Sequence, residues 1–233
     1  MRKTGFFITG TDTGVGKTWA TLCLMREFRA RGLRVLGMKP VATGGVFQGG
    51  RLVNEDALAL RAAASVLLPY ARVNPYVYEP PVSPHIAAAW AGIPIDLDRI
   101  VKVFNGLSES ADCVLVEGVG GWAVPLNGRS RVADLALALG LPAILVVGLR
   151  LGCLNHALLA HAAILSSGVE FAGWIANRVE KDFPAAQENI ETLAHELSAP
   201  PLAILPHGET APPLLHGVFP VLEPDEILRA RGS

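Results

Sequence analysis

Short apolar runs that recur along the chain constrain its fold more than any other feature. These runs are hydrophobic at nearly every position and rich in β-branched or aromatic residues. They are Phe6–Thr9, Val35–Met38, Cys113–Val116, Ala143–Val147, Phe171–Ala176 and Leu202–Leu205. Continuous rather than alternating hydrophobicity is typical of strands that are buried on both faces of a parallel sheet. The runs therefore predict a sheet covered by other elements on each side.

Helical patterns separate these runs. The expected helices are Lys17–Arg31, Glu55–Leu67, Leu97–Leu107, Leu154–Ser167 and Ala185–Leu197. Such alternation predicts an α/β fold, a doubly wound, mainly parallel sheet flanked by helices. The 233 residues suit one domain over 1–233. The proline-rich stretch Pro69–Pro94 is expected to be a loop excursion with one short helix, Pro84–Ala91.

Composition and charge exclude several classes of protein. Hydrophobic residues make up 51% of the chain and charged residues 18%, which excludes an intrinsically disordered chain. The apolar stretch Leu135–Leu149 is shorter than the roughly 18–20 residues of a membrane span. Twenty basic and 21 acidic residues without a basic run argue against nucleic acid. Three widely spaced cysteines suit reduced thiols, so a soluble, cytoplasmic protein without a membrane or nucleic-acid partner is expected.

A glycine-rich loop between the first strand and the first helix predicts nucleotide binding. The loop reads Gly10-Thr11-Asp12-Thr13-Gly14-Val15-Gly16-Lys17-Thr18, with Thr11 where the strict pattern has its first glycine. Backbone N–H groups of such a loop approach phosphate oxygens, and the helix N-terminus adds partial positive charge. The residues expected to contact nucleotide are Thr13, Gly14, Val15, Gly16, Lys17 and Thr18.

Acidic side chains near strand ends are candidates for binding the metal that accompanies the nucleotide. Glu117 follows the third apolar run directly, and Gly118 and Gly120 lie in the glycine-rich segment after it. Its place at a strand end favours a metal ligand over a surface carboxylate. Asp56 lies at the start of a predicted helix. From its position alone it is either a second metal ligand or a carboxylate stabilised by the helix dipole.

Other polar residues follow the remaining strands. Lys39 comes directly after the second run, where a cation can stabilise the negative charge on a transferred phosphoryl group. Thr43 is either a donor to substrate or a turn residue. Asn177 and the segment Pro206-His207-Gly208 follow the last two strands and suit the walls of an adenine pocket, although neither signal is specific.

Together these stretches resemble the dethiobiotin synthetases of biotin biosynthesis over roughly residues 5–207. The matching motifs include the phosphate loop and Lys39-Pro40-Val41-Ala42-Thr43-Gly44, Asp56-Ala57-Leu58, Val73-Asn74-Pro75-Tyr76, Ser83-Pro84-His85-Ile86, Val116-Glu117-Gly118, Gly120-Gly121-Trp122, Leu151-Gly152-Cys153-Leu154-Asn155-His156 and Gly173-Trp174-Ile175-Ala176-Asn177. The resemblance implies an ATP- and Mg²⁺-dependent homodimeric cyclo-ligase. Such an enzyme captures CO₂ as a carbamate on 7,8-diaminononanoate, phosphorylates the carbamate with ATP, and closes the ring to dethiobiotin, ADP and phosphate.

The resemblance also implies roles for individual residues. Lys39 and Lys17 would be catalytic, and Thr18, Asp56 and Glu117 would bind Mg²⁺. The ATP site would comprise the phosphate loop together with Asp56, Glu117, Gly118, Gly120, Asn177, Pro206, His207 and Gly208. Substrate contacts would be Thr43 and Thr11, with Leu151, Gly152, Cys153 and Asn155 of the partner subunit receiving the substrate carboxylate at the dimer interface.

The main alternative is a switch ATPase of the ParA or MinD type, which shares the expected fold and a deviant phosphate loop. Proteins of that type carry a second lysine four residues before the last glycine of the loop, where this chain has Asp12. Departures from the dethiobiotin synthetase pattern are Gly14 for a common glutamate, Asn189 for a tyrosine and His207 for a larger aromatic residue.

Overall fold

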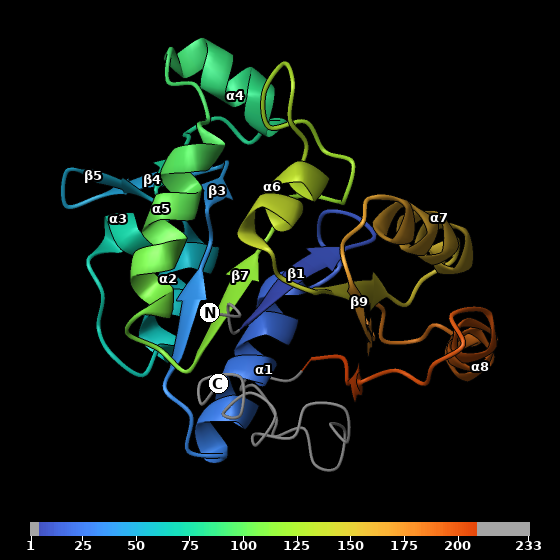
Figure 1. Cartoon of the computed structure of the whole chain (residues 1–233). Helices are drawn as coiled ribbons and strands as arrows, with labels where there is room; N and C mark the ends of the chain where they lie inside the picture. The colour runs from blue at the N-terminus through green and yellow to red at the C-terminus, as the bar shows by residue number, and fades with distance from the viewer. Residues whose placement is uncertain (1–4, 209–233) are drawn as a thin grey trace.

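The computed structural model describes residues 5–208, and its centre is a six-stranded sheet (Figure 1). The strands are β1 (Gly5–Gly10), β2 (Val35–Met38), β7 (Cys113–Glu117), β8 (Ala143–Gly148), β9 (Phe171–Asn177) and β10 (Ala203–Leu205). They lie in the order β10-β9-β8-β1-β7-β2, and every neighbouring pair is parallel. The six expected strands and the parallel sheet are therefore confirmed. The expected domain over 1–233 extends beyond the described residues at both ends.

Helices connect the strands and cover the sheet (Figure 1). They are α1 (Lys17–Ala30), α2 (Glu55–Ala63), α3 (Tyr70–Val73), α4 (Pro84–Ala91), α5 (Leu97–Ser108), α6 (Val132–Leu139), α7 (Cys153–Ser166) and α8 (Ala186–Glu196). Helix α1 packs against α2 and β2, α5 against α6, and α7 against α8. Within residues 5–208, no helix is long and apolar enough to cross a membrane.

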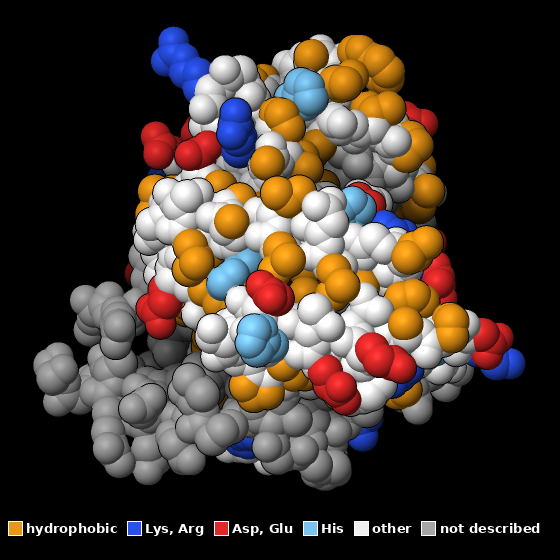
Figure 2. All heavy atoms as spheres, turned by 90° about the vertical axis from the view of Figure 1, so that its right-hand side faces the viewer, with side chains coloured by type: hydrophobic (Ala, Val, Ile, Leu, Met, Phe, Trp, Pro, Cys, Tyr) orange, Lys and Arg blue, Asp and Glu red, His pale blue; other side chains and the backbone are white. Residues whose placement is uncertain are grey.

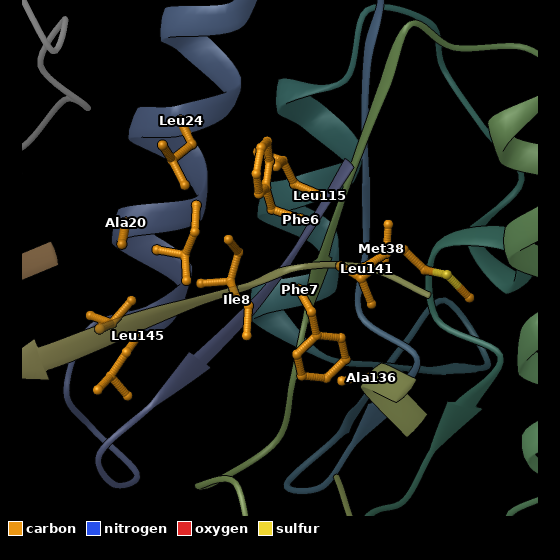
Figure 3. Packing of buried hydrophobic residues seen from close by; sticks show 14 of the residues in the cluster. Phe6, Phe7, Ile8, Ala20, Leu24, Met38, Leu115, Ala136, Leu141 and Leu145 are labelled. Atoms are coloured by element: carbon orange, nitrogen blue, oxygen red, sulfur yellow. The ribbon is translucent and has the colours of Figure 1, made fainter. Parts of the chain in front are cut away.

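Strand β1 shows why the apolar runs are continuous. Successive side chains of a strand point to opposite faces of a sheet. Phe6 and Ile8 lie beside Leu24 of α1, whereas Phe7 lies on the other side beside Ala136 of α6 (Figure 3). All three β1 side chains are buried. Both faces of the strand are thus covered by helices, so these three successive positions all carry apolar side chains.

The segment after β2 contains small sheets that the apolar runs do not predict. Strands β3 (Val41–Ala42) and β6 (Tyr76–Val77) form a parallel pair, and β4 (Val46–Gln48) pairs with β5 (Arg51–Val53) as a hairpin. Each strand has only two or three residues, too few to give a periodic pattern. The stretch 69–94 therefore holds α3 and β6 besides the expected helix α4, so the expectation of a loop with a single helix was wrong.

The second helix is shorter than expected, because the residues that follow Ala63 form hydrogen bonds with β2. The expected helix ran to Leu67, but α2 ends at Ala63 and Ala64 adopts an extended conformation. Ser65 then bonds to the first residue of β2. Its hydroxyl accepts a hydrogen bond from the backbone N–H of Val35 at 2.9 Å, and its own N–H donates to the Val35 carbonyl at 2.9 Å. A hydrogen bond between distant segments overrides the local helical preference here.

Candidate active site

The register of the sheet brings the predicted polar residues to one edge. Met38 of β2 lies opposite Val116 of β7, so Lys39 and Glu117, the next residue of each strand, emerge side by side. Glu117 also lies opposite Ile8 of β1, just before the phosphate loop begins. Ligands of open α/β sheets bind at this carboxyl edge.

Two glycines give the phosphate loop its shape. Gly14 has a φ of 75° and Gly16 a φ of 84°, both in the left-handed region that favours glycine. Gly16 is also the residue that precedes the first turn of α1. A Cβ atom at Gly16 would lie 2.1 Å from the side-chain nitrogen of Asn177, so a larger residue does not fit. The loop therefore carries its backbone close to the helix N-terminus, as phosphate binding requires.

The Lys17 side chain folds back over the loop. Its ammonium donates a hydrogen bond to the carbonyl oxygen of Asp12 at 2.8 Å. Burial, followed by repulsion from the Lys39 ammonium, lowers the pKa of Lys17 to about 8. Burial removes the water that would stabilise the charge of this ammonium. A phosphate group that binds beside it supplies a negative charge instead, so the bound anion stabilises the charged form of Lys17.

This buried ammonium predicts a pH dependence of stability. Below about pH 8 the folded and unfolded states both carry the proton, so the penalty of burial is complete. Between about pH 8 and the unfolded pKa of about 10.5 the unfolded state binds more protons, so the folded state gains stability as the pH rises. Without nucleotide, Lys17→Met is expected to exceed the wild type in free energy of unfolding at pH 7, by a margin that narrows towards pH 10. Urea titrations across this range measure the margin. A margin that stays constant contradicts the lowered pKa.

Lys39 lies at the centre of a charged cluster. Its side chain is 4% exposed, and its ammonium is 2.5 Å from Oε1 of Glu117 and 3.0 Å from Oδ2 of Asp56. The ammonium also donates to the carbonyl oxygen of Gly118 at 3.2 Å. Burial alone disfavours the charged ammonium, but the two carboxylates outweigh it and raise the pKa of Lys39. Likewise, Lys39 outweighs the effect of burial on Asp56 and lowers its pKa. Lys39 and Asp56 are therefore both charged at neutral pH.

Thr18, Asp56 and Glu117 form a donor set that suits a hard cation. The Thr18 hydroxyl donates to Oε1 of Glu117 at 2.9 Å. Oε2 of the same fully buried carboxylate has no hydrogen-bond partner within residues 5–208. An orphaned buried carboxylate oxygen is costly unless something binds it. No group of three or more His, Cys, Asp and Glu side chains in the described chain is arranged to hold a metal. Two carboxylates and one hydroxyl nevertheless suit Mg²⁺, which takes one or two carboxylates and completes its shell with phosphate oxygens and water.

A pocket of about 360 Å³ joins these groups. Its lining comprises Thr13, Gly14, Gly16, Lys17, Thr18, Lys39, Ala42, Thr43, Asn54, Asp56, Glu117, Val119 and Gly120. Both candidate catalytic lysines and all three candidate metal ligands thus face one space. Thr43 lies on its wall, as a substrate contact would.

The candidate adenine residues lie at the next strands of the same edge. Asn177 ends β9, and residues 206–208 follow the neighbouring strand β10. The Asn177 amide nitrogen donates to the Val15 carbonyl at 2.9 Å, which ties β9 to the phosphate loop. His207 is exposed, and its Nδ1 lies 3.2 Å from the carbonyl oxygen of Arg178. The structure thus gives Asn177 a role in holding the loop that its sequence position alone does not reveal.

The segment expected to receive the substrate carboxylate does not line the Lys39 pocket of its own chain. Leu151 is 92% exposed, and Cys153 is the first residue of α7, with its thiol 3.6 Å from the side-chain oxygen of Asn189. Arg150, which precedes Leu151, forms an ion pair of 2.8 Å with Asp12. Thr11 likewise lines a separate cavity of about 490 Å³ between the phosphate loop and α7.

The sequence analysis did not identify two features of the site. Asn54 lines the pocket and accepts a hydrogen bond from the Ala57 N–H at the start of α2. Its position just before Glu55 and Asp56 is the usual signal for a helix N-cap, and this signal could have identified it. The pair of Arg150 with Asp12 joins residues 138 positions apart, and no local pattern reports it.

Comparison with known sequences adds to this geometry. A family profile described as an AAA domain matches residues 4–212. A protein of Aromatoleum aromaticum named ATP-dependent dethiobiotin synthetase BioD is 50% identical over 208 residues, which is 89% of this chain and 92% of that protein. A protein of the same name from Xanthomonas axonopodis pv. citri is 46% identical over 220 residues, 94% of this chain and 98% of that protein.

Solved structures of similar shape share much less sequence. The MinC:MinD cell division complex of Aquifex aeolicus matches with a TM-score of 0.54 and 19% identity, over 99% of this chain and 96% of that one. A ParA family ATPase of Chlorobium tepidum matches with a TM-score of 0.52 and 13% identity, over 89% and 86%. At such identities the likeness concerns the P-loop NTPase fold alone.

Proposed function

The chain belongs to the family of ATP-dependent dethiobiotin synthetases, and from this premise we propose that it closes the ureido ring of dethiobiotin from 7,8-diaminononanoate, CO₂ and ATP. One observation supports this reaction above others, namely that Lys39 lies in one pocket with Lys17 and the phosphate loop. A phosphate loop alone suits any nucleotide-binding protein. The second buried ammonium at the same pocket is what the transfer of a phosphoryl group to an anionic acceptor needs.

The proposed reaction proceeds through two leaving groups. One amine adds to CO₂ and loses a proton, which gives a carbamate. A carbamate oxygen attacks the γ-phosphorus of ATP and ADP leaves, so that a carbamic-phosphoric anhydride forms. The second amine attacks the carbonyl carbon, phosphate leaves with the bridging oxygen, and a further proton is released. The products are dethiobiotin, ADP and phosphate.

The chain's own residues are proposed to offset the repulsion between the two reacting anions, the carbamate and ATP. Residues 13–18 are proposed to hold the β- and γ-phosphates, with Lys17 moving from the Asp12 carbonyl to phosphate oxygens. Lys39 is proposed to stabilise the carbamate and the transferring phosphoryl group, and Thr43 to orient the amine-bearing end of the substrate. Asn177 and residues 206–208 are proposed to frame the adenine, with the Asn177 carbonyl oxygen facing the base, since its amide nitrogen already binds the loop.

Thr18, Asp56 and Glu117 are proposed to hold Mg²⁺, for which the unpartnered Oε2 of Glu117 is the main support. Magnesium, when bound, neutralises phosphate charge and orients the γ-phosphate. We expect Asp56→Asn to raise the Mg²⁺ concentration for half-maximal turnover about 10- to 100-fold, a cost typical of an altered metal site. Glu55→Gln, which removes the neighbouring exposed carboxylate of α2, is the matched control and is expected to leave the requirement unchanged. Equal Mg²⁺ titrations for the two variants would contradict the assignment of Asp56.

A homodimer with its active sites at the subunit interface is proposed for two reasons. The residues expected to receive the substrate carboxylate, 151–155, do not line the Lys39 pocket of the same chain, which supports their contribution by a second copy. Leu159 and Leu165 of α7 are exposed, and so is Leu151, two residues before the helix begins. Apolar side chains are spread over this face between polar and charged ones (Figure 2). Association of two copies is favoured when it removes such apolar surface from contact with water. The prediction of a cytoplasmic location, made from the sequence, is retained.

Sharing of the active site can be measured with mixed dimers. Lys39→Ala and Asn155→Ala damage different parts of the proposed site, one in each subunit. Each variant alone is expected to be nearly inactive, whereas unfolding and refolding the two together creates mixed dimers with one intact site. Because random pairing makes half of the dimers mixed, about a quarter of the wild-type turnover is expected to return. No gain over the separate variants would mean that each chain completes its own site.

The reaction itself is tested with purified protein, diaminononanoate, ¹³C-bicarbonate, Mg²⁺ and ATP. Mass spectrometry is expected to show ¹³C-dethiobiotin in equal amount to ADP. A switch ATPase of the MinD or ParA type would release ADP without it. That alternative shares only the fold with this chain, and Asp12 stands where such proteins have their second lysine. ADP release with no labelled product from folded protein would overturn the proposed reaction.

A further inference from the structure

We propose that Tyr70 and Asn74 are positioning residues that hold Lys39 and the N-terminus of α2, which carries Asp56, in fixed relation to each other. The proposal rests on the reaction proposed above, in which Lys39 acts on the phosphoryl group. Both residues lie outside the pocket, at the two ends of the short helix α3. Hydrogen bonds from this pair reach the two segments that supply the charged cluster.

Asn74 binds the backbone of Lys39. Its side-chain nitrogen donates to the Lys39 carbonyl at 2.7 Å and to the Tyr76 carbonyl at 2.9 Å. The Lys39 N–H in turn donates to the carbonyl of Val73 at 2.8 Å. Both peptide groups of Lys39 are thus bound by residues 73 and 74. Because β2 ends at Met38, these bonds replace the sheet as the support of the lysine backbone.

Tyr70 connects Asn74 to α2. Its hydroxyl donates to Oδ1 of Asn74 at 2.7 Å and accepts a hydrogen bond from the backbone N–H of Asn54 at 2.8 Å. Asn54 is the N-cap of α2, and Asp56 lies in the first turn that this cap begins. Burial raises the pKa of Tyr70, so its hydroxyl keeps the proton that it donates.

The network has the features of a functional support rather than of core packing. Tyr70 is 6% and Asn74 2% exposed, and an apolar side chain would fill either place without needing hydrogen-bond partners. The amide of Asn74 instead has both N–H donors and its carbonyl oxygen satisfied. A satisfied polar network of this kind fixes a single geometry. That geometry sets the 3.0 Å contact between the Lys39 ammonium and Asp56, on which a displacement of about 1 Å can cost 10²-fold in rate.

Tyr70→Phe tests the proposal, with Tyr78→Phe as the matched control. Tyr78 is also buried, and its hydroxyl donates to the Ile93 carbonyl at 2.8 Å, outside the network. Each variant loses one buried tyrosine hydroxyl, so similar losses of thermal stability are expected. Only Tyr70→Phe is expected to lower kcat for dethiobiotin formation, by at least about 10-fold. The KM for ATP is expected to stay within about twofold in both, because neither hydroxyl bonds to the phosphate loop.

A second set of variants tests whether the two residues act as one unit. Asn74→Asp keeps an oxygen for Tyr70 but loses the donors to Lys39 and Tyr76, and it is expected to match Tyr70→Phe in kcat. The double variant Tyr70→Phe/Asn74→Asp is expected to lose little more than either single one, as coupled residues do. If Tyr70→Phe and Asn74→Asp keep the kcat of Tyr78→Phe, or if losses multiply in the double variant, the positioning role is wrong. Should the wild type and Tyr78→Phe make no dethiobiotin either, it is the proposed reaction that fails.

Discussion

Replacing Lys39 by methionine is expected to lower kcat for dethiobiotin formation by about 10³-fold, the upper range for loss of one electrostatic donor in a buried site. The Lys39 side chain is 4% exposed and lines the same pocket as the phosphate loop, so water cannot replace its charge. The KM for ATP is expected to change less than kcat, because Lys17 and the loop remain. Steady-state kinetics over ATP concentration separate the two parameters.

The variant needs a control for folding, because Lys39 neutralises a buried carboxylate. Glu117 is fully buried, and removing one partner of a buried ion pair typically costs about 3–5 kcal/mol. The double variant Lys39→Met/Glu117→Gln removes both charges and is expected to recover most of the thermal stability but none of the activity. Recovery of activity together with stability would mean that Lys39 serves the fold and not the phosphoryl transfer.

Replacing Lys17 by alanine is expected to lower kcat/KM for ATP by about 10²- to 10³-fold. Its ammonium lies over the loop that would receive the β- and γ-phosphates, where it binds the Asp12 carbonyl until an anion arrives. Unlike Lys39, it has a lowered pKa of about 8, which marks a charge that destabilises the folded protein without ligand. The variant is therefore expected to unfold no earlier than the wild type while binding ATP far more weakly, as calorimetric titration would show.

Lys102→Ala is the matched control for this variant. Lys102 is an exposed lysine of α5, remote from the pocket, and its loss changes the net charge by the same amount. ATP affinity like that of the wild type is expected. If Lys17→Ala and Lys102→Ala bind ATP equally well, the ammonium over the loop has no part in nucleotide binding.

Sequence patterns predict the long helices and strands, and also the charged residues at the carboxyl edge of the sheet, for a physical reason. Strands that are buried on both faces are apolar at most positions, so β1, β7 and β8 are recognisable in the sequence as apolar runs. A parallel sheet gathers the carboxyl ends of its strands at one edge, which is why polar residues at strand ends were expected to form the site. Lys39, which follows β2, and Glu117, which ends β7, lie in contact at this edge.

The features that sequence patterns do not predict depend on contacts between residues that are distant in the sequence. The end of α2 depends on Ser65 reaching Val35, and β3 and β6 have two residues each. Asp56 was ambiguous as a helix-start carboxylate until its 3.0 Å contact with Lys39 joined it to the site. The network through Tyr70 and Asn74 spans residues 39–76, and polar side chains in such a network carry no periodic signal.

If ATP phosphorylates a carbamate, one oxygen atom of CO₂ must leave with the released phosphate, and an oxygen tracer follows that atom. The reaction is run briefly with freshly added C¹⁸O₂, diaminononanoate, Mg²⁺ and ATP, before exchange with water removes the label. Attack of the second amine on the anhydride carbon leaves one ¹⁸O in the ureido carbonyl and sends the bridging ¹⁸O out with phosphate. We predict one ¹⁸O in each molecule of released phosphate, in step with dethiobiotin. Labelled dethiobiotin accompanied by unlabelled phosphate would contradict transfer of the phosphoryl group to the carbamate.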